Sequence, residues 1–401
     1  MLLPAGGRLS PDGRSAVSAS SDLHLLASQQ VLKPLVRRIG LVVKSQCPHG
    51  FQEMPVVLLQ HGGLDNLSGK TGLAMLRHRR GPIVAVIDPA HAGQPLEMVA
   101  GIARSVPIVE DLQQALTFAP QAAVVGLAPS GGRLPDALRR DAIAALKAGL
   151  HLASGLHTHL AKDPELAASR RPGCWIWDLR QEPPGLRVGQ ARAAALTSHR
   201  VLAVGTDMAV GKMSVCLELL AAAEHCSHPA RFVGTGQAGI LISGDGVALD
   251  AVKVDYAAGA VEAAVLRAGE GLPDHGLILV EGQGSLCHPG STATLPLLRG
   301  SQPTELVLVH RAGQTSIDRV AGFPLPSLRE LVVITETIAA MARPASAGPA
   351  PRVRAIALNT ARLHERDAQE AVESTAEELG LPCSDPVRWG GQSLLRALLG
   401  D

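Results

Sequence analysis

A glycine-rich segment ending in lysine, "VGTDMAVGK" at residues 204–212, has the residue types that bind phosphate groups. The apolar run 201–204 leads into Gly205, and Gly211 and Lys212 follow after five intervening residues. Glycines let backbone N–H groups turn inward, a helix N-terminus presents free donors, and a lysine adds a mobile charge. The common pattern has four intervening residues. We predict a phosphate-binding loop; the alternative is a strand-to-helix turn in which glycine serves geometry alone.

The residue after the lysine departs from the common pattern. Met213 stands where a serine or threonine is usual, and Ser214 comes one place later. A thioether does not supply the hard oxygen that Mg²⁺ prefers, and Ser214 points about 100° further around the helix. We therefore expect nucleotide binding to survive this change better than metal-assisted phosphoryl transfer. The predicted cofactor-binding residues are Gly205, Thr206, Asp207, Val210, Gly211, Lys212, Met213 and Ser214.

Two segments together resemble dethiobiotin synthetase and the related cobyrinic acid amide-forming enzymes. The loop "GTDMAVGK" is similar to their Gly-Thr-Asp and Val-Gly-Lys-Thr elements, and "LILVEGQGSL" at 277–286 is similar to a strand end whose glutamate helps to bind magnesium. This resemblance implies that Glu281 is a candidate ligand of Mg²⁺, with Asp255 a weaker one. It also implies ATP as cofactor in a reaction that activates a carboxylate as its phosphate.

A longer series of motifs resembles a bacterial and archaeal family whose characterised members are D-glutamate N-acetyltransferases. The resemblance covers about residues 55–400, and Lys-Met-Ser is a usual form of the loop in that family. It implies a Rossmann-like first domain, a P-loop second domain, acetyl-CoA as the donor and the amine of an acidic amino acid as the acceptor. The matching segments are "HGGLDNLSGKTG" (61–72), "VAVIDPAHAG" (84–93), "GLAPSGGRLP" (126–135), "SGLHTHLAKDPEL" (154–166), "GTDMAVGKMS" (205–214), "GTGQAGILISGDGV" (234–247), "VDYAAGAVE" (254–262), "VEGQGSLCHPG" (280–290) and "GSQPTELVLVH" (300–310).

Acetyl transfer to an amine requires a base that removes a proton from the amine. Two candidates follow the predicted strand 277–282. Glu281 ends an apolar strand, where a carboxylate is costly without a partner, and this favours a base or metal role over a structural ion pair. His288 lies in a loop, where it is either catalytic or makes one backbone hydrogen bond. Cys287 has no activating neighbour in the sequence, and we interpret it as a small buried residue.

The first half of the chain repeats the spacing of the loop. Gly63 is followed after five residues by Gly69, Lys70 and Thr71, which permits a second anion-binding loop. Asp88, at the end of the next predicted strand, instead favours a Rossmann turn of the kind that holds a ribose. A turn that only packs against a partner domain or subunit is an equally good interpretation.

Two other segments of the first half carry polar candidates. The segment 130–133 follows a predicted strand, and its backbone donors and guanidinium fork predict a substrate-carboxylate site, the alternative being an ordinary capped helix start. The pair His157 and His159 has no third metal ligand nearby, so we interpret it as structural or substrate-binding. The predicted substrate-binding residues are Ser130, Gly131, Gly132 and Arg133.

Alternating strands and helices position these residues. Short apolar runs separated by helix-length stretches predict an α/β protein with parallel sheets. We expect an N-terminal extension over 1–50, a Rossmann-like domain over 51–195 and a P-loop NTPase-like α/β domain over 196–401. The expected strands are 56–60, 83–88, 106–109, 122–128, 151–155, 201–205, 230–235, 277–282, 305–310, 330–335 and 353–359.

The composition restricts the class of protein. The 401 residues include 37 basic and 36 acidic side chains, which argues against nucleic-acid binding. No apolar run reaches the ~18 residues of a membrane span, and the six cysteines are far apart, so we expect a cytoplasmic enzyme. We also expect a homo-oligomer. Aromatic residues are only 2%, so the core must consist of Ala, Leu, Val and Ile. A carboxylate-activating ligase and a nucleotide-binding regulator without turnover remain alternatives to the acetyltransferase.

Overall fold

The computed structural model describes residues 45–128 and 134–400. The expected extension, 1–50, lies outside these ranges apart from 45–50, and so does the candidate substrate segment Ser130, Gly131, Gly132 and Arg133. No helix in the described ranges is long and apolar enough to cross a membrane.

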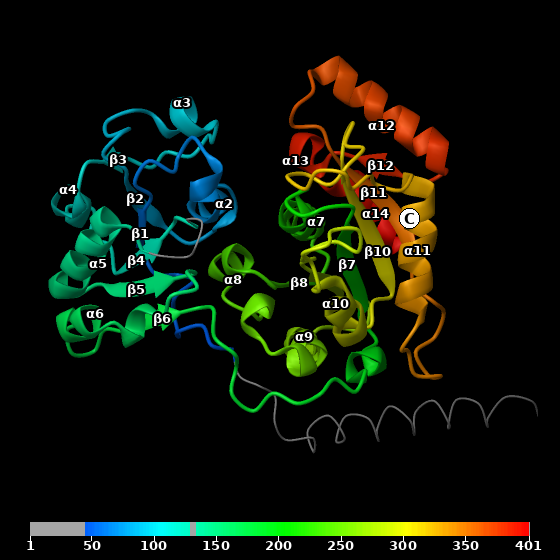
Figure 1. Cartoon of the computed structure of the whole chain (residues 1–401), viewed down its shortest axis with the longest axis horizontal. Helices are drawn as coiled ribbons and strands as arrows, with labels where there is room; N and C mark the ends of the chain where they lie inside the picture. The colour runs from blue at the N-terminus through cyan, green and yellow to red at the C-terminus, as the bar shows by residue number, and fades with distance from the viewer. Residues whose placement is uncertain (1–44, 129–133, 401) are drawn as a thin grey trace, which may run out of the picture. The chain divides into compact units, whose positions relative to one another are not determined.

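The first half forms a six-stranded sheet, all parallel, in the order β3-β2-β1-β4-β5-β6 (Figure 1). Its strands are β1 (Val56–Leu59), β2 (Ile83–Ile87), β3 (Ile108–Val109), β4 (Ala122–Val125), β5 (His151–Ser154) and β6 (Ile176–Asp178). Its helices are η1 (Leu67–Gly69), α2 (Lys70–His78), α3 (Leu96–Ala100), α4 (Leu112–Leu116), α5 (Asp136–Ala148), η2 (Leu160–Lys162) and α6 (Pro164–Ser169). This order, with right-handed crossovers expected between parallel strands, is that of a Rossmann-like wind.

The second half forms another six-stranded parallel sheet, in the order β12-β11-β10-β7-β9-β8. Its strands are β7 (His199–Gly205), β8 (Ala230–Val233), β9 (Leu277–Val280), β10 (Glu305–Arg311), β11 (Arg352–Asn359) and β12 (Cys383–Ser384). Its helices are η3 (Arg192–Ala195), α7 (Lys212–His225), α8 (Gln237–Ser243), η4 (Leu249–Ala251), α9 (Val254–Gly269), α10 (Thr294–Ser301), α11 (Leu328–Ala340), α12 (Glu365–Leu379), α13 (Pro386–Trp389) and α14 (Gln392–Leu399). The predicted fold class is confirmed.

Helices cover both faces of the second sheet because alternate strand residues point to opposite sides. Val201 and Ala203 of β7 pack in the cluster that includes α7 and α14. Leu202 and Val204 pack in the cluster that includes α9, α10 and α11. Strands buried on both faces read as continuous apolar runs, which is why β7 and β10 were recognisable in the sequence.

One of the strand predictions is wrong. The segment "ELVVIT", 330–335, lies within helix α11 (Figure 1). Ser327 and Glu330 form a capping box that starts the helix. The buried residues Leu331, Thr335 and Ala339 are four apart, which is a helical spacing, whereas Val333 and Ile334 are exposed. The short strands β6 and β12 were not predicted.

A buried arginine and an aromatic cluster contribute to the packing. The rings of Phe51, Trp175 and Trp177 pack edge to face, at centroid separations of 5.2 to 6.5 Å. The guanidinium of Arg79 lies over Phe51 and donates to Phe51 O at 2.6 Å and to Leu241 O, in α8, at 3.1 Å. The expectation of a core built from aliphatic residues therefore holds for the sheets, while this cluster uses several of the few aromatic residues.

Candidate functional site

The predicted phosphate loop runs from the end of β7 to the start of α7, at the carboxyl edge of the second sheet. Gly211 precedes the helix with φ +116°, a conformation that favours glycine, and Ala209 is also left-handed at φ +54°. A Cβ atom at Gly205 would lie 2.6 Å from Lys212 Nζ, so the absence of a side chain there leaves room for the lysine. The local sequence thus produces the turn that we predicted.

Lys212 is the first residue of α7, and its side chain folds back into the loop. It is 6% exposed, and Nζ donates to the carbonyl oxygen of Asp207 at 2.7 Å. Burial lowers its pKa from 10.5 to about 8, and the charges of Asp207 and Glu281 oppose that shift. A buried ammonium with a carbonyl partner gains strongly from an incoming anion, because the anion replaces part of the lost hydration.

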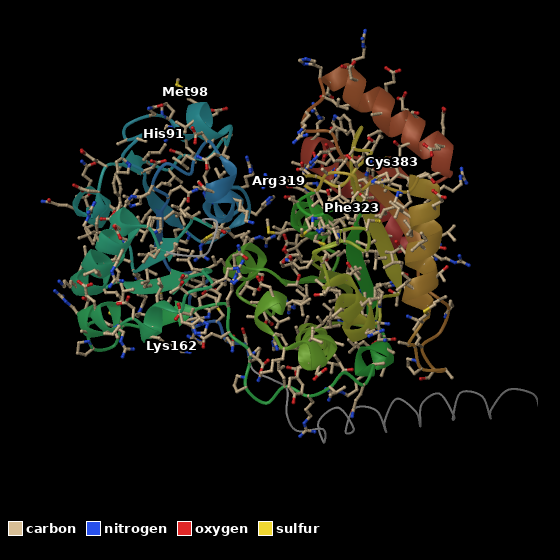
Figure 2. All side chains as sticks on the ribbon, viewed as in Figure 1. His91, Met98, Lys162, Arg319, Phe323 and Cys383 are labelled. Carbon is tan, nitrogen blue, oxygen red and sulfur yellow. The ribbon has the colours of Figure 1, made fainter. Side chains whose placement is uncertain are left out.

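The carboxylate of Asp207 fixes the loop instead of facing a ligand. Oδ1 accepts from Met208 N at 2.6 Å. Oδ2 accepts from Gln314 Nε2 at 2.6 Å and from Asp318 N at 2.7 Å. Both partners belong to the segment after β10, which also carries Arg319 and Phe323 (Figure 2). Asp207 therefore holds this segment with its carboxylate, while its backbone carbonyl oxygen accepts the hydrogen bond from Lys212.

Two further polar residues hold the loop, and the sequence pattern did not indicate them. Thr206 Oγ1 is hydrogen-bonded to His310 Nδ1 at 2.9 Å, and Asn359 Nδ2 donates to Val210 O at 2.9 Å. Burial lowers the pKa of His310 to about 4, so its ring is neutral at pH 7. His310 and Asn359 end apolar strands, and a polar residue at that place is the signal that would have identified them.

Glu281 follows β9, which neighbours β7, and is buried beside the loop. Oε2 accepts from Thr235 N at 2.8 Å and Gly236 N at 3.2 Å. Gln283 Nε2 is 3.3 Å from Oε1. Burial raises the pKa of the carboxyl from 4.5 to about 7, and the two N–H donors and Lys212 lower it only in part. A carboxyl that titrates near neutrality is suited to proton transfer.

The remaining predicted residues differ in their burial and their contacts. Met213 is half-buried against the core, and Ser214 is half-buried one place on. His288 Nδ1 accepts from Gly290 N at 3.0 Å, and burial raises the pKa of Cys287. Asp255 is exposed in the first turn of α9. Within 45–128 and 134–400, no three His, Cys, Asp or Glu side chains gather as metal ligands, so magnesium binding stays a prediction.

The corresponding loop of the first half has a different interior. Gln60 is fully buried, and its Nε2 donates to Gly63 O at 3.1 Å and to Gly69 O at 2.9 Å. Asp88 accepts from Gly62 N at 2.7 Å and contacts His91 Nδ1 at 3.0 Å. A loop that turns carbonyls toward a glutamine amide does not present donors to an anion. These contacts favour the interpretation of this segment as a packing turn.

These features define an α/β protein with a Rossmann-like N-terminal half and a P-loop C-terminal half. The chain belongs to the DUF1611 family. It matches that family's "Domain of unknown function (DUF1611_C) P-loop domain" over residues 187–395 and its Rossmann-like N-terminal domain over 89–182. The resemblance stated from the sequence is thereby confirmed.

Several known proteins are similar to this chain. A protein from Tritonibacter scottomollicae named D-glutamate N-acetyltransferase is 33% identical over 86% of this chain and 98% of its own length. A protein of the same name from a Pseudoalteromonas species is 34% identical over 69% of this chain and 80% of its own. A crystal structure of a DUF1611 family protein from Anabaena variabilis ATCC 29413 has a TM-score of 0.81 and 50% identity, and covers 87% of this chain and 100% of that one.

Proposed function

We propose that this protein transfers the acetyl group of acetyl-CoA to the amine of D-glutamate. The observation that carries the proposal is the buried Lys212, held in a glycine-rich loop beside Glu281, in a chain whose relatives are named for that reaction. Coenzyme A contains a pyrophosphate and a further phosphate, which such a loop would hold without hydrolysing them. The backbone of 205–212 and the Lys212 ammonium are the groups that would bind them.

Glu281 is the better candidate for the base. In the reaction, the amine nitrogen attacks the thioester carbonyl and the C–S bond breaks. The departing CoA thiolate takes up the second proton that the nitrogen loses as the amide forms. The ammonium of D-glutamate must first lose a proton, which Glu281 would accept because its pKa of about 7 leaves much of it ionised at neutral pH. His288 uses Nδ1 for Gly290 N and has Nε2 left for the same task.

The proposal is tested by following CoA thiol release with D-glutamate, L-glutamate and D-aspartate as acceptors. We expect release with D-glutamate that the L-isomer does not match. Glu281→Gln should lose most activity, and matched His288→Gln should retain it; the reverse result would move the base to His288.

Two other outcomes would support other functions. Release of ADP that depends on Mg²⁺ and a carboxylate would favour a ligase of the dethiobiotin synthetase type. Tight binding of ATP or CoA without either product would favour a nucleotide-binding regulator. Met213 opposes the first of these, because it supplies no oxygen ligand for Mg²⁺.

A further inference from the structure

Polar side chains from both halves of the chain meet around Arg180. Arg180 lies two residues after β6, His157 lies in the segment after β5, and Gln237 is the first residue of α8. The guanidinium Nη1 contacts His157 Nε2, and Nη2 donates to Gln237 Oε1 at 2.6 Å. Nη2 also forms an ion pair with Asp250 Oδ2 at 3.3 Å. The arginine side chain is only 12% exposed, so its surroundings hold a cation that is largely out of water.

The Nε–H donor of this guanidinium points to a ligand. Nε of Arg180 is buried and makes no hydrogen bond within the described part of the chain. A buried N–H group without a partner is uncommon and costly. Nε and Nη2 form one edge of the guanidinium fork, the kind of edge that binds two carboxylate oxygens at once. Asp250 engages this edge at Nη2 alone, and its own side chain is 47% exposed, so another carboxylate could displace it.

The neighbours of Arg180 also favour an anionic ligand. His157 is exposed, and its Nε2 accepts from Nη1, which leaves the edge formed by Nε and Nη2 for a ligand. The other amide atom of Gln237, Nε2, lies 3.5 Å from the hydroxyl of Thr71. The amide of Gln237 therefore contacts both Arg180 and Thr71. A carboxylate would satisfy the Nε–H group of the guanidinium better than water does, because charge-assisted hydrogen bonds are stronger in buried sites.

The same backbone segment connects this cluster to Glu281. Gly236 N donates to Glu281 Oε2, and Gln237 follows it directly in the chain. A Cβ atom at Gly155 would lie 2.7 Å from Gln237 Cβ, so the end of β5 is held closely against the start of α8. A carboxylate on Arg180 would therefore be fixed relative to the candidate base through one short piece of backbone.

We propose that Arg180 binds a carboxylate of the acidic amino acid that accepts the acetyl group, through Nε and Nη2. This inference rests on the proposed function. The bound carboxylate takes the place of Asp250, and Gln237 orients the guanidinium. The site selects acceptors that carry the carboxylate over their amides.

The experiment measures the KM of each substrate in wild-type protein, Arg180→Gln, Asp250→Asn and the matched control Arg187→Gln, whose side chain is exposed. The acceptors are D-glutamate, D-glutamine and the α-amide of D-glutamate. In Arg180→Gln we expect the KM for D-glutamate to rise on the order of 100-fold and the KM for acetyl-CoA to stay unchanged. The variant should no longer prefer D-glutamate over one of the two amides. In Asp250→Asn the KM for D-glutamate should be unchanged or lower, because a competing carboxylate is removed.

Other results would overturn the inference. Equal kinetic changes in Arg180→Gln and Asp250→Asn, with equal losses of melting temperature, would make the pair a structural ion pair. A raised KM for acetyl-CoA would assign Arg180 to the donor. If Arg180→Gln does not fold, Arg180→Lys keeps the charge without the fork, and it should still raise the KM for D-glutamate.

A failure of the proposed function can be distinguished from a failure of the carboxylate site. If wild-type protein acetylates no acidic amino acid, calorimetric titration with D-glutamate tests the carboxylate site alone. Heat of binding in wild type that disappears in the arginine variant would support the site. Equal binding in both, or binding in neither, would overturn it.

Discussion

Replacement of Lys212 by methionine should stabilise the protein in buffer without cofactor. Folding lowers the pKa of this lysine from 10.5 to about 8 because the ammonium is buried. That difference corresponds to about 3 kcal/mol in favour of the unfolded state when the lysine is charged in both states. The lost hydrogen bond from Nζ to Asp207 O offsets about 1 kcal/mol of the gain. The expected net effect of Lys212→Met is about 2 kcal/mol of added stability.

The effect is measured by equilibrium unfolding in urea near pH 6, where Glu281, with a pKa of about 7, is mostly protonated. The expected midpoint is higher at an unchanged slope, with a melting temperature raised by about 3 °C. In wild type, stability should also rise with pH between about 8 and 10.5, because the unfolded lysine holds its proton in that range and the folded one does not. The variant should lack this rise. If Lys212→Met instead lowered the free energy of unfolding by about 2 kcal/mol and kept the pH dependence, Lys212 would not be a buried charge that destabilises the protein until an anion binds.

The remaining predictions concern activity and packing. The kcat/KM for acetyl-CoA should be bell-shaped, rising through about pH 7 as Glu281 loses its proton and falling through about pH 8 as Lys212 loses its own; a profile flat from pH 6 to 9 would contradict both roles. Glu281→Gln should lower kcat by about 10²- to 10⁴-fold and abolish the rise near pH 7, whereas an unaltered profile would exclude it as the base. Gly239→Ala should lower kcat as well, because its Cβ would lie 2.3 Å from Glu281 Oε2, and wild-type kinetics would show that the carboxylate moves freely. Arg79→Met should cost about 3 kcal/mol in urea unfolding through the backbone carbonyls it leaves without a donor, and a loss below about 1 kcal/mol would contradict that account.

The fold and the phosphate loop could be predicted because their signals are local. Buried parallel strands appear as apolar runs, and Gly205, Gly211 and Lys212 follow one of them at a recognisable spacing. Helix α11 was misassigned because "ELVVIT" is rich in β-branched residues. The capping box at Ser327 and the helical spacing of Leu331 and Thr335 make that segment a helix instead.

The rest of the site depends on contacts between distant segments. Nothing near Gln60 in the sequence shows that its amide fills the turn at Gly63 and Gly69. The link from Asp207 to Gln314 spans more than a hundred residues. Arg180 lies in a segment rich in proline and glycine, and only its meeting with Gln237 gives it a candidate role. Such pairings follow from topology, which single-sequence patterns do not encode.

The central claim is that the loop between β7 and α7 binds the phosphates of the acetyl donor. Calorimetric titration of wild-type protein and Lys212→Met with acetyl-CoA, and with acetyl-pantetheine, which lacks every phosphate, tests it most directly. We predict that the substitution weakens acetyl-CoA binding on the order of 100-fold and leaves acetyl-pantetheine binding unchanged. An equal effect on both ligands, or none on acetyl-CoA, would contradict the claim.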